Sequence, residues 1–154
     1  MKPDYFLLPE RVERLRQACE SWDGTPFRQR SLVKGGGGGV DCGGFLGSAF
    51  LESGAIDVAI AMPPYDLDHA EHSSDSLLRA WFEQPAVRAR VRRVDEEEPH
   101  LDGDIVFPIV GLCEHHLGLH IGWIVYHVMR ASGFARSPAA GLKLAPSRYR
   151  LIEP

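Results

Sequence analysis

A cysteine among glycines is the residue of this chain best suited to do chemistry. Cys42 follows a run of five glycines in the stretch 35–50, which reads GGGGGVDCGGFLGSAF. Apolar residues then recur over positions 45–50 at the spacing of one helical face, so we expect a buried helix that begins close to Cys42. A thiol at a helix N-terminus lies near unpaired backbone N–H groups and the positive end of the helix dipole, and both favour the reactive thiolate. This pattern predicts a nucleophile at Cys42.

A nucleophilic cysteine needs a base and, usually, a third group that orients the base. Among the seven histidines, His116 and His127 are the best placed by pattern. Residues 115–122 alternate as a strand does, and residues 124–129 indicate a second strand after a tight turn. In such a hairpin we expect His116 and His127 to lie roughly opposite each other on one face, with about 5 Å between their Cβ atoms. His115 points to the other face and competes with His116 for the role of base.

The elements that must position these residues begin with helices. An apolar stripe predicts a helix over residues 9–22, in which Cys19 is expected to be an inert core thiol. The helix that begins at the candidate nucleophile should end near Ser53, which precedes a glycine. Two prolines make residues 63–69 irregular, and serines and an aspartate offer N-caps for a further helix around residues 75–82.

From residue 103 onward the apolar pattern has the period of a sheet. Before it, residues 86–94 fit either a strand throughout or a short helix followed by a strand, and residues 95–98 fit a solvated turn. Helices first and antiparallel strands second predict a single α+β domain over residues 1–154, with N-terminal helices packed on a C-terminal antiparallel sheet. Strands are expected near residues 104–107, 115–122, 124–129, 142–144 and 149–152.

Composition and charge exclude several classes of function. The chain has 154 residues, of which 44% are hydrophobic and 25% charged, so it can form a core without metal or disulfide crosslinks. A net charge of −4 gives no reason to expect nucleic acid or an anionic membrane as a partner. Three cysteines at unrelated spacings argue against a disulfide framework. No apolar run approaches the ~20 residues of a membrane span, and the N-terminus lacks a convincing signal peptide, so we expect synthesis in the cytoplasm.

Four short motifs follow one another along the chain: Trp22-x-Gly24-Thr25-Pro26-Phe27, Asp41-Cys42-Gly43-Gly44-Phe45, Gly103-Asp104-Ile105-Val106-Phe107 and His116-Leu117-Gly118-Leu119. In this order they resemble the NlpC-type family of papain-like cell-wall cysteine peptidases. The resemblance covers the chain from about Trp22 to Met129. Two further segments, 63–66 and 126–129, are more similar to the phage-associated members of the family than to its secreted ones.

The resemblance implies a papain-like fold and a role for each matching residue. Cys42 would be the nucleophile, and His116 would be the base that takes its proton and later protonates the leaving amine. His127 would match the third residue of the family, which orients the base. No metal or other cofactor is implied.

The oxyanion and substrate-binding region would include Asp41, Gly43 and Phe27. In the family, backbone N–H groups near the cysteine stabilise the oxyanion, often with help from an upstream tyrosine. That tyrosine position corresponds here to Phe27, which has no hydroxyl. Loss of one such donor typically costs ~10²–10³ in rate, so Phe27 points to weak or altered activity. Gly43 stands where the family often has serine, and a backbone donor would survive that change.

Each role has a simpler alternative. Cys42 could be an inert core thiol, His116 a structural strand histidine, and His127 a polar residue at a sheet edge. Asp41 could serve only to cap the helix, and Asp104 could only start a strand.

A metal site is a further alternative. Cys113, His115 and His116 could ligate a metal ion together with Cys42. The sequence has no CxxC pair there, and we expect no metal.

The leading hypothesis from the sequence is a thiol hydrolase that cleaves an amide bond in a peptidoglycan stem peptide. Cys42 would form a thioester, and water activated by His116 would release the acid. Another acyl transfer on an amide is the second enzymatic candidate. A different class of function is an assembly protein of a phage tail or particle, with the same fold and weak or no catalysis. Phe27 favours that alternative.

Overall fold

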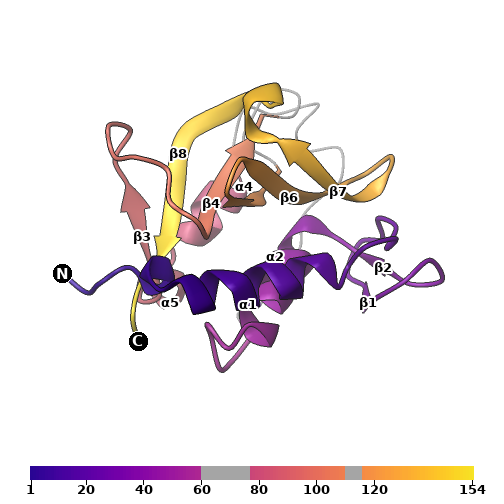
Figure 1. Cartoon of the computed structure of the whole chain (residues 1–154), viewed down its shortest axis with the longest axis horizontal. Coiled ribbons are helices and arrows are strands. Elements are labelled where there is room, and N and C mark those ends of the chain that lie inside the picture. The colour runs from indigo at the N-terminus through magenta and orange to yellow at the C-terminus, as the bar shows by residue number, and fades with distance from the viewer. Residues whose placement is uncertain (60–76, 110–115) are drawn as a thin grey trace.

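Helices form one layer of the molecule and a sheet forms the other. The computed structural model describes residues 1–59, 77–109 and 116–154. Figure 1 shows α1 and α2 side by side below the sheet, and the two helices contact each other. The helical elements of the described part are η1 (Tyr5–Leu7), α1 (Pro9–Glu20), α2 (Cys42–Glu52), α4 (Leu77–Phe82), α5 (Pro85–Arg88) and η2 (Ala139–Gly141).

The main sheet has six strands in the described residues, in the order β3-β8-β4-β5-β6-β7. Every neighbouring pair in it is antiparallel, and β1 and β2 form a separate small hairpin. This arrangement confirms the predicted α+β class, with N-terminal helices on a C-terminal antiparallel sheet. The strands are β1 (Leu32–Val33), β2 (Gly39–Val40), β3 (Val91–Val94), β4 (Asp104–Pro108), β5 (Gly118–Ile121), β6 (Ile124–Met129), β7 (Gly133–Pro138) and β8 (Leu144–Leu151).

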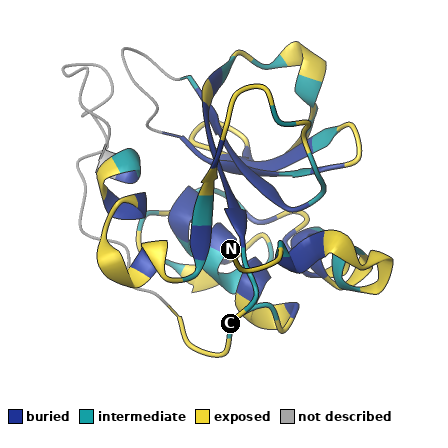
Figure 2. Cartoon of the chain, turned by 90° about the vertical axis from the view of Figure 1, so that its left-hand side faces the viewer, coloured by how far each residue is buried: buried dark blue, intermediate teal, exposed yellow. Residues whose placement is uncertain are grey.

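The core fills the space between α1, α2 and the sheet, where Figure 2 shows the buried residues gathered. Leu15 and Cys19 of α1 and Phe45 of α2 have no exposed surface, and neither does Leu119 of β5. Burial raises the pKa of the Cys19 thiol well above its usual value, because the thiolate would lose its solvation. Cys19 is therefore the inert core thiol that the sequence predicts.

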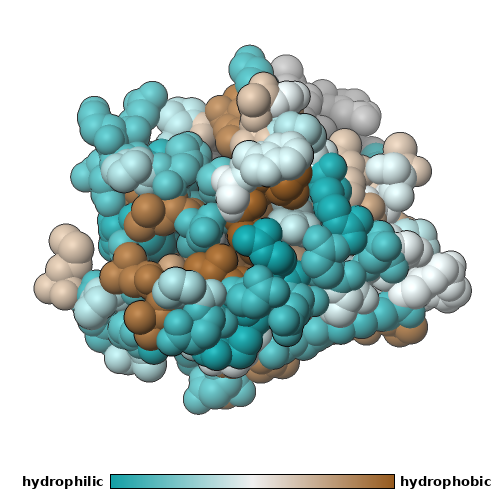
Figure 3. All heavy atoms as spheres, viewed as in Figure 1, coloured by the Kyte–Doolittle hydropathy of each residue, from teal (hydrophilic) through white to brown (hydrophobic). Residues whose placement is uncertain are grey.

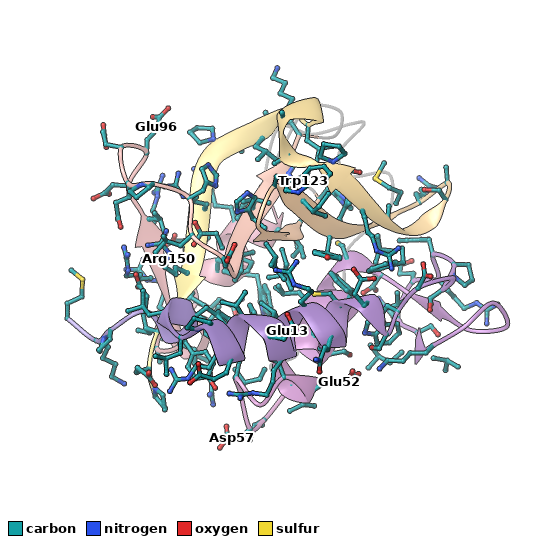
Figure 4. The ribbon with its side chains drawn as sticks, in the orientation of Figure 1. Glu13, Glu52, Asp57, Glu96, Trp123 and Arg150 are labelled. Carbon is teal, nitrogen blue, oxygen red and sulfur yellow. The ribbon has the colours of Figure 1, made fainter. Side chains whose placement is uncertain are left out.

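A network of charges joins the start of the chain to its last strand. Arg150 of β8 binds Asp104 of β4 through Nε–Oδ1 and Nη2–Oδ2 contacts of 2.5 and 3.0 Å, and both side chains are buried. Arg150, which is labelled in Figure 4, also donates to Asp4 at 3.1 Å, and Arg92 of β3 binds the same carboxylate. Glu98, in the segment expected to be a solvated turn, pairs with Arg92 as well. Asp104 therefore does more than start a strand: it neutralises a buried guanidinium.

Several predicted boundaries are corrected by the structure. Residues 86–94 form the short helix α5 and then β3, which was the second of the two alternatives. The two closing strands expected at 142–144 and 149–152 are one strand, β8. Pro146 breaks the strand pattern in the sequence, but the register of β8 against β4 shifts there, and an irregular ladder tolerates a proline.

Three strands, β1, β2 and β7, were not predicted. β7 is an edge strand in which the first two residues are buried and the last four alternate between partly exposed and exposed positions, and it contains Ser137 and Pro138, which are typical of loops. The irregular segment 63–69, the predicted caps of the helix at 75–82, Cys113 and His115 lie outside the described residues. Within the described ranges, no helix combines the length and the apolar character needed to cross a membrane.

Candidate active site

Cys42 is the first residue of α2, as the sequence predicts. Asp41 precedes it in an extended conformation, and its Oδ1 accepts a hydrogen bond from the Gly44 N–H at 2.7 Å. This is the N-cap alternative, and it fixes where the helix begins. The other oxygen, Oδ2, accepts from the Arg30 N–H at 2.9 Å. One buried carboxylate thus fixes both the start of α2 and the loop that precedes it. Cys42, the next residue in the sequence, is only 5% exposed.

The glycine after Gly43 is closely packed. A Cβ on Gly44 would lie 2.8 Å from Leu32 Cδ2 and 3.0 Å from Asp41 Oδ1, so a larger residue would displace the Leu32 side chain and crowd the capping carboxylate. Gly43 itself is buried in the first turn of α2. Helix geometry leaves its backbone N–H without an acceptor inside the helix, next to the Cys42 side chain in sequence. An N–H in that position can donate to an oxyanion formed at the thiol.

Phe27 lies beside the strand that leads to the cysteine. It forms a bridge with Val40, and hydrogen bonds of 3.1 Å run from Arg28 N to Val40 O and from Val40 N to Pro26 O. The Phe27 side chain is partly buried against the core. The segment is thus held two residues before Cys42, and its aromatic ring brings no hydroxyl to this region.

His116 and His127 are in direct contact. His116 Nε2 lies 2.8 Å from His127 Nδ1, the ring centroids are 5.1 Å apart, and both residues are buried. The predicted proximity of the two histidines is confirmed, but the predicted strand register is wrong. Gly118, not His116, is the partner of His127 in the ladder, and His116 precedes β5 by two residues.

The register follows from the turn. Ile121 pairs with Ile124 around a two-residue turn in which Gly122 has φ +64°, and this places Gly118 opposite His127. His116 then reaches His127 along a diagonal of the ladder, a distance that a long side chain can span. A Cβ on Gly118 would lie 3.2 Å from His127 Cβ, so the glycine also leaves room for the imidazole.

The second ring nitrogen of His127 contacts a residue whose role the sequence pattern did not indicate. His127 Nε2 lies 2.7 Å from the Oγ of Ser137 on β7. Burial lowers the pKa of His127, because the charged imidazolium would lose its solvation, so His127 is neutral at neutral pH. Ser137 was missed because β7 itself has no clear strand pattern.

The helix that begins at Cys42 packs on the part of the sheet that carries His127. α2 contacts both β5 and β6. Cys42 belongs to the same core cluster as Leu117 and Val128, which follow the two histidines in sequence. Since His116 Nε2 faces His127, Nδ1 is the ring nitrogen through which His116 would have to serve a thiol. Such a set can take the proton of a thiol and hold the imidazolium that results.

Two other features of the described residues bear on the site. No three or more His, Cys, Asp or Glu side chains among them are placed to hold a metal ion. A groove of about 440 Å³ lies where η1 and the start of α1 meet Leu101 and Asp102. Hydrophobic side chains gather near the N-terminal end of α1 in Figure 3. This groove is lined by neither Cys42 nor either histidine of the pair.

Comparison with known proteins gives structural matches only. No model of a protein family matches the chain, and no curated protein matches it. Among solved structures, a protein described as similar to a lipoprotein of the NLP/P60 family, from Staphylococcus aureus, has a TM-score of 0.56 and 17% identity. The peptidoglycan hydrolase RipB from Mycobacterium tuberculosis has a TM-score of 0.54 and 23% identity. The P60 domain of an antigen from M. avium paratuberculosis has a TM-score of 0.52 and 17% identity.

These matches extend over almost the whole of the present chain. They cover 98%, 94% and 90% of it, and 44%, 66% and 91% of the respective solved chains. The chain thus spans less than two thirds of the staphylococcal and M. tuberculosis chains that it matches. At these identities the likeness shows the fold, which is the papain-like α+β fold of NlpC/P60 domains.

Proposed function

We propose that this protein is a cysteine peptidase that hydrolyses an amide bond in peptidoglycan stem peptides. Cys42 is the nucleophile, His116 the base and His127 the residue that orients the base. The observation that carries the proposal is the buried 2.8 Å contact between the two histidines, on the part of the sheet against which the helix of Cys42 packs. The NlpC/P60 fold supports the same assignment, since RipB, which shares it, is described as a peptidoglycan hydrolase.

The first chemical step transfers the thiol proton. His116 Nδ1 takes the proton of Cys42, and the thiolate attacks the carbonyl carbon of the scissile amide. The N–H of Gly43 and the positive end of the α2 dipole stabilise the oxyanion that forms. The imidazolium of His116 is held in place by the acceptor at His127 Nδ1.

The second half of the reaction returns the enzyme to its starting state. The C–N bond breaks, the leaving amine takes the proton from His116, and the acyl group stays on Cys42 as a thioester. Water then gives a proton to His116 Nδ1 and attacks the thioester, so that the acid leaves and the thiol is restored. Both halves need His116 with a fixed ring orientation, which the contact with His127 provides.

A direct test uses defined stem peptides. The purified protein is incubated with synthetic peptides that represent peptidoglycan stems, and new amine and carboxyl ends are identified by mass spectrometry. We expect one amide bond to be cut by the wild type and none by Cys42→Ala. Cleavage that persists in Cys42→Ala, at the wild-type rate, would show that the chemistry lies elsewhere.

A second candidate function is assembly of a phage tail or particle, and Phe27 is the observation that favours it. Without a hydroxyl at this position the oxyanion has one donor fewer than in tyrosine-containing relatives, which fits a domain kept for its surface rather than its catalysis. The Cys42→Ala variant separates the two functions: an assembly protein works as well with alanine as with cysteine, whereas a peptidase does not.

A further inference from the structure

Three side chains, from the residue two positions before β5 and from strands β6 and β7, form a continuous line of contacts. His116 Nε2 faces His127 Nδ1 at 2.8 Å, and His127 Nε2 faces Ser137 Oγ at 2.7 Å. In the ladder His127 is opposite Ala135, so Ser137, two residues on, projects from the same face of β7 as Ala135. Each ring nitrogen of the buried His127 is thus engaged by one neighbour.

The single N–H of a neutral His127 allows only two arrangements of the hydrogen bonds among these three side chains. A neutral imidazole carries one N–H, so His127 donates in one of its two contacts and accepts in the other. If it donates to Ser137, its Nδ1 accepts from His116 Nε2–H, and His116 Nδ1 is unprotonated. If it accepts from the serine hydroxyl, its Nδ1–H donates to His116 Nε2, and His116 carries its proton on Nδ1.

The two arrangements differ in whether His116 can act. Only the first leaves His116 Nδ1 able to accept a proton from a thiol. The charged state of His116, after it has taken that proton, carries N–H on both nitrogens and is compatible with the first arrangement alone. An acceptor at His127 Nε2 is therefore needed before and after the proton transfer.

We propose that Ser137 is a positioning residue that holds His127 with its proton on Nε2 and thereby keeps Nδ1 of His116 available as the base. Its catalytic consequence rests on the function proposed above, but the position of the proton on His127 does not. Ser137 is partly exposed, so its own O–H can donate to solvent while Oγ accepts from His127. A hydroxyl also accepts without bringing a negative charge, so it does not favour a charged His127.

The effect of a substitution at Ser137 on the proton of His127 should therefore depend on whether the new side chain provides a neutral hydrogen-bond acceptor. Ser137→Thr keeps the hydroxyl and should behave as the wild type. Ser137→Ala removes the acceptor, so the proton of His127 should move in part or in full to Nδ1. Ser132→Ala is a matched control, because Ser132 is an exposed serine in the turn before β7.

The experiment reads the protonated nitrogen directly. Protein labelled with ¹⁵N in histidine is examined by long-range ¹H–¹⁵N correlation at neutral pH, and His127 is assigned from the signals lost in His127→Gln. We expect Nε2 of His127 to be protonated in the wild type, in Ser137→Thr and in Ser132→Ala, and a shift toward Nδ1–H in Ser137→Ala. Protonation of Nδ1 in the wild type, or a Ser137→Ala spectrum unchanged at His127, would overturn the proposal.

A second measurement separates this inference from the proposed function. We expect the rate of Cys42 alkylation at neutral pH to fall ~10-fold in Ser137→Ala, part of the 10²–10⁴ that a general base contributes, and to recover in Ser137→Thr. If alkylation is the same in all variants while the proton on His127 still moves, Ser137 positions that proton as proposed and the catalytic role of Cys42 fails. If alkylation depends on His116 but the proton on His127 does not respond to Ser137, the function stands and this inference fails.

Discussion

His116 and His127 touch through ring nitrogens 2.8 Å apart although they are not partners in the β5–β6 ladder. The residue opposite His127 is Gly118, whose lack of a side chain lets the buried imidazole occupy the face of the sheet. The pair is thus a product of three local features: a two-residue turn, a glycine two positions after the first histidine, and a diagonal reach between strands.

A methyl group at position 118 should disturb this arrangement. In Gly118→Ala the new Cβ would lie 2.6 Å from Val125 Cγ1 and 3.0 Å from Tyr126 O, so the strands must move apart. We expect a loss of about 1–3 kcal/mol in the free energy of unfolding, measured by urea denaturation. Gly47→Ala is the control, because nothing lies within 4 Å of that Cβ in the middle of α2. It should be neutral or add about 0.5–1 kcal/mol. Equal stability of the two variants would contradict the described packing.

The stability of the protein should depend on the protonation of His127. Its pKa is lower in the folded than in the unfolded protein because of burial, so the unfolded chain binds the proton more readily. The stabilising contribution of neutral His127 is complete above the ordinary histidine pKa of about 6.5 and is lost as the pH falls through the folded value. In His127→Gln, the free energy of unfolding should therefore decrease less between about pH 7 and 5 than in the wild type. Parallel pH profiles for the two proteins would show that His127 does not titrate in this way.

A hydroxyl at position 27 should raise the rate of hydrolysis if the phenyl ring stands where related enzymes have tyrosine. In Phe27→Tyr we expect kcat on the cleaved stem peptide to increase, with an upper bound of ~10²–10³ for one oxyanion donor. Phe27→Leu is the control for packing, since it alters the same partly buried position without adding a hydroxyl. A tyrosine variant no faster than the wild type would place Phe27 outside the oxyanion region.

Local sequence patterns were sufficient for the helix start and for the contact between the histidines. An aspartate before Cys42 and apolar residues after it specify a capped helix, because both signals lie within one or two turns. The hairpin of β5 and β6 is also local, so the contact between the two histidines could be predicted from their spacing alone. The residue that pairs with His127 in the ladder depends on the turn at Gly122. The alternation of residue types in the sequence does not specify that turn.

The features that the sequence did not reveal depend on distant parts of the chain. Ser137 reaches His127 only because β7 forms the edge of the sheet, and a serine followed by a proline suggests a loop. Arg150 and Asp104 are 46 residues apart, and their pairing follows from β8 lying beside β4. Neither relationship has a periodic signal, since each is fixed by strand order rather than by residue spacing.

The most direct test of the account is the pH dependence of Cys42 alkylation by iodoacetamide in the wild type and in His116→Ala. Alkylation reports the thiolate and needs no knowledge of the substrate. We predict that Cys42 of the wild type reacts with an apparent pKa well below the ~8.5 of an ordinary thiol, and that His116→Ala restores the ordinary value. A Cys42 that is unreactive, or that titrates as an ordinary thiol with and without His116, would contradict the proposed Cys42–His116 pair and leave the assembly function as the better explanation of the fold.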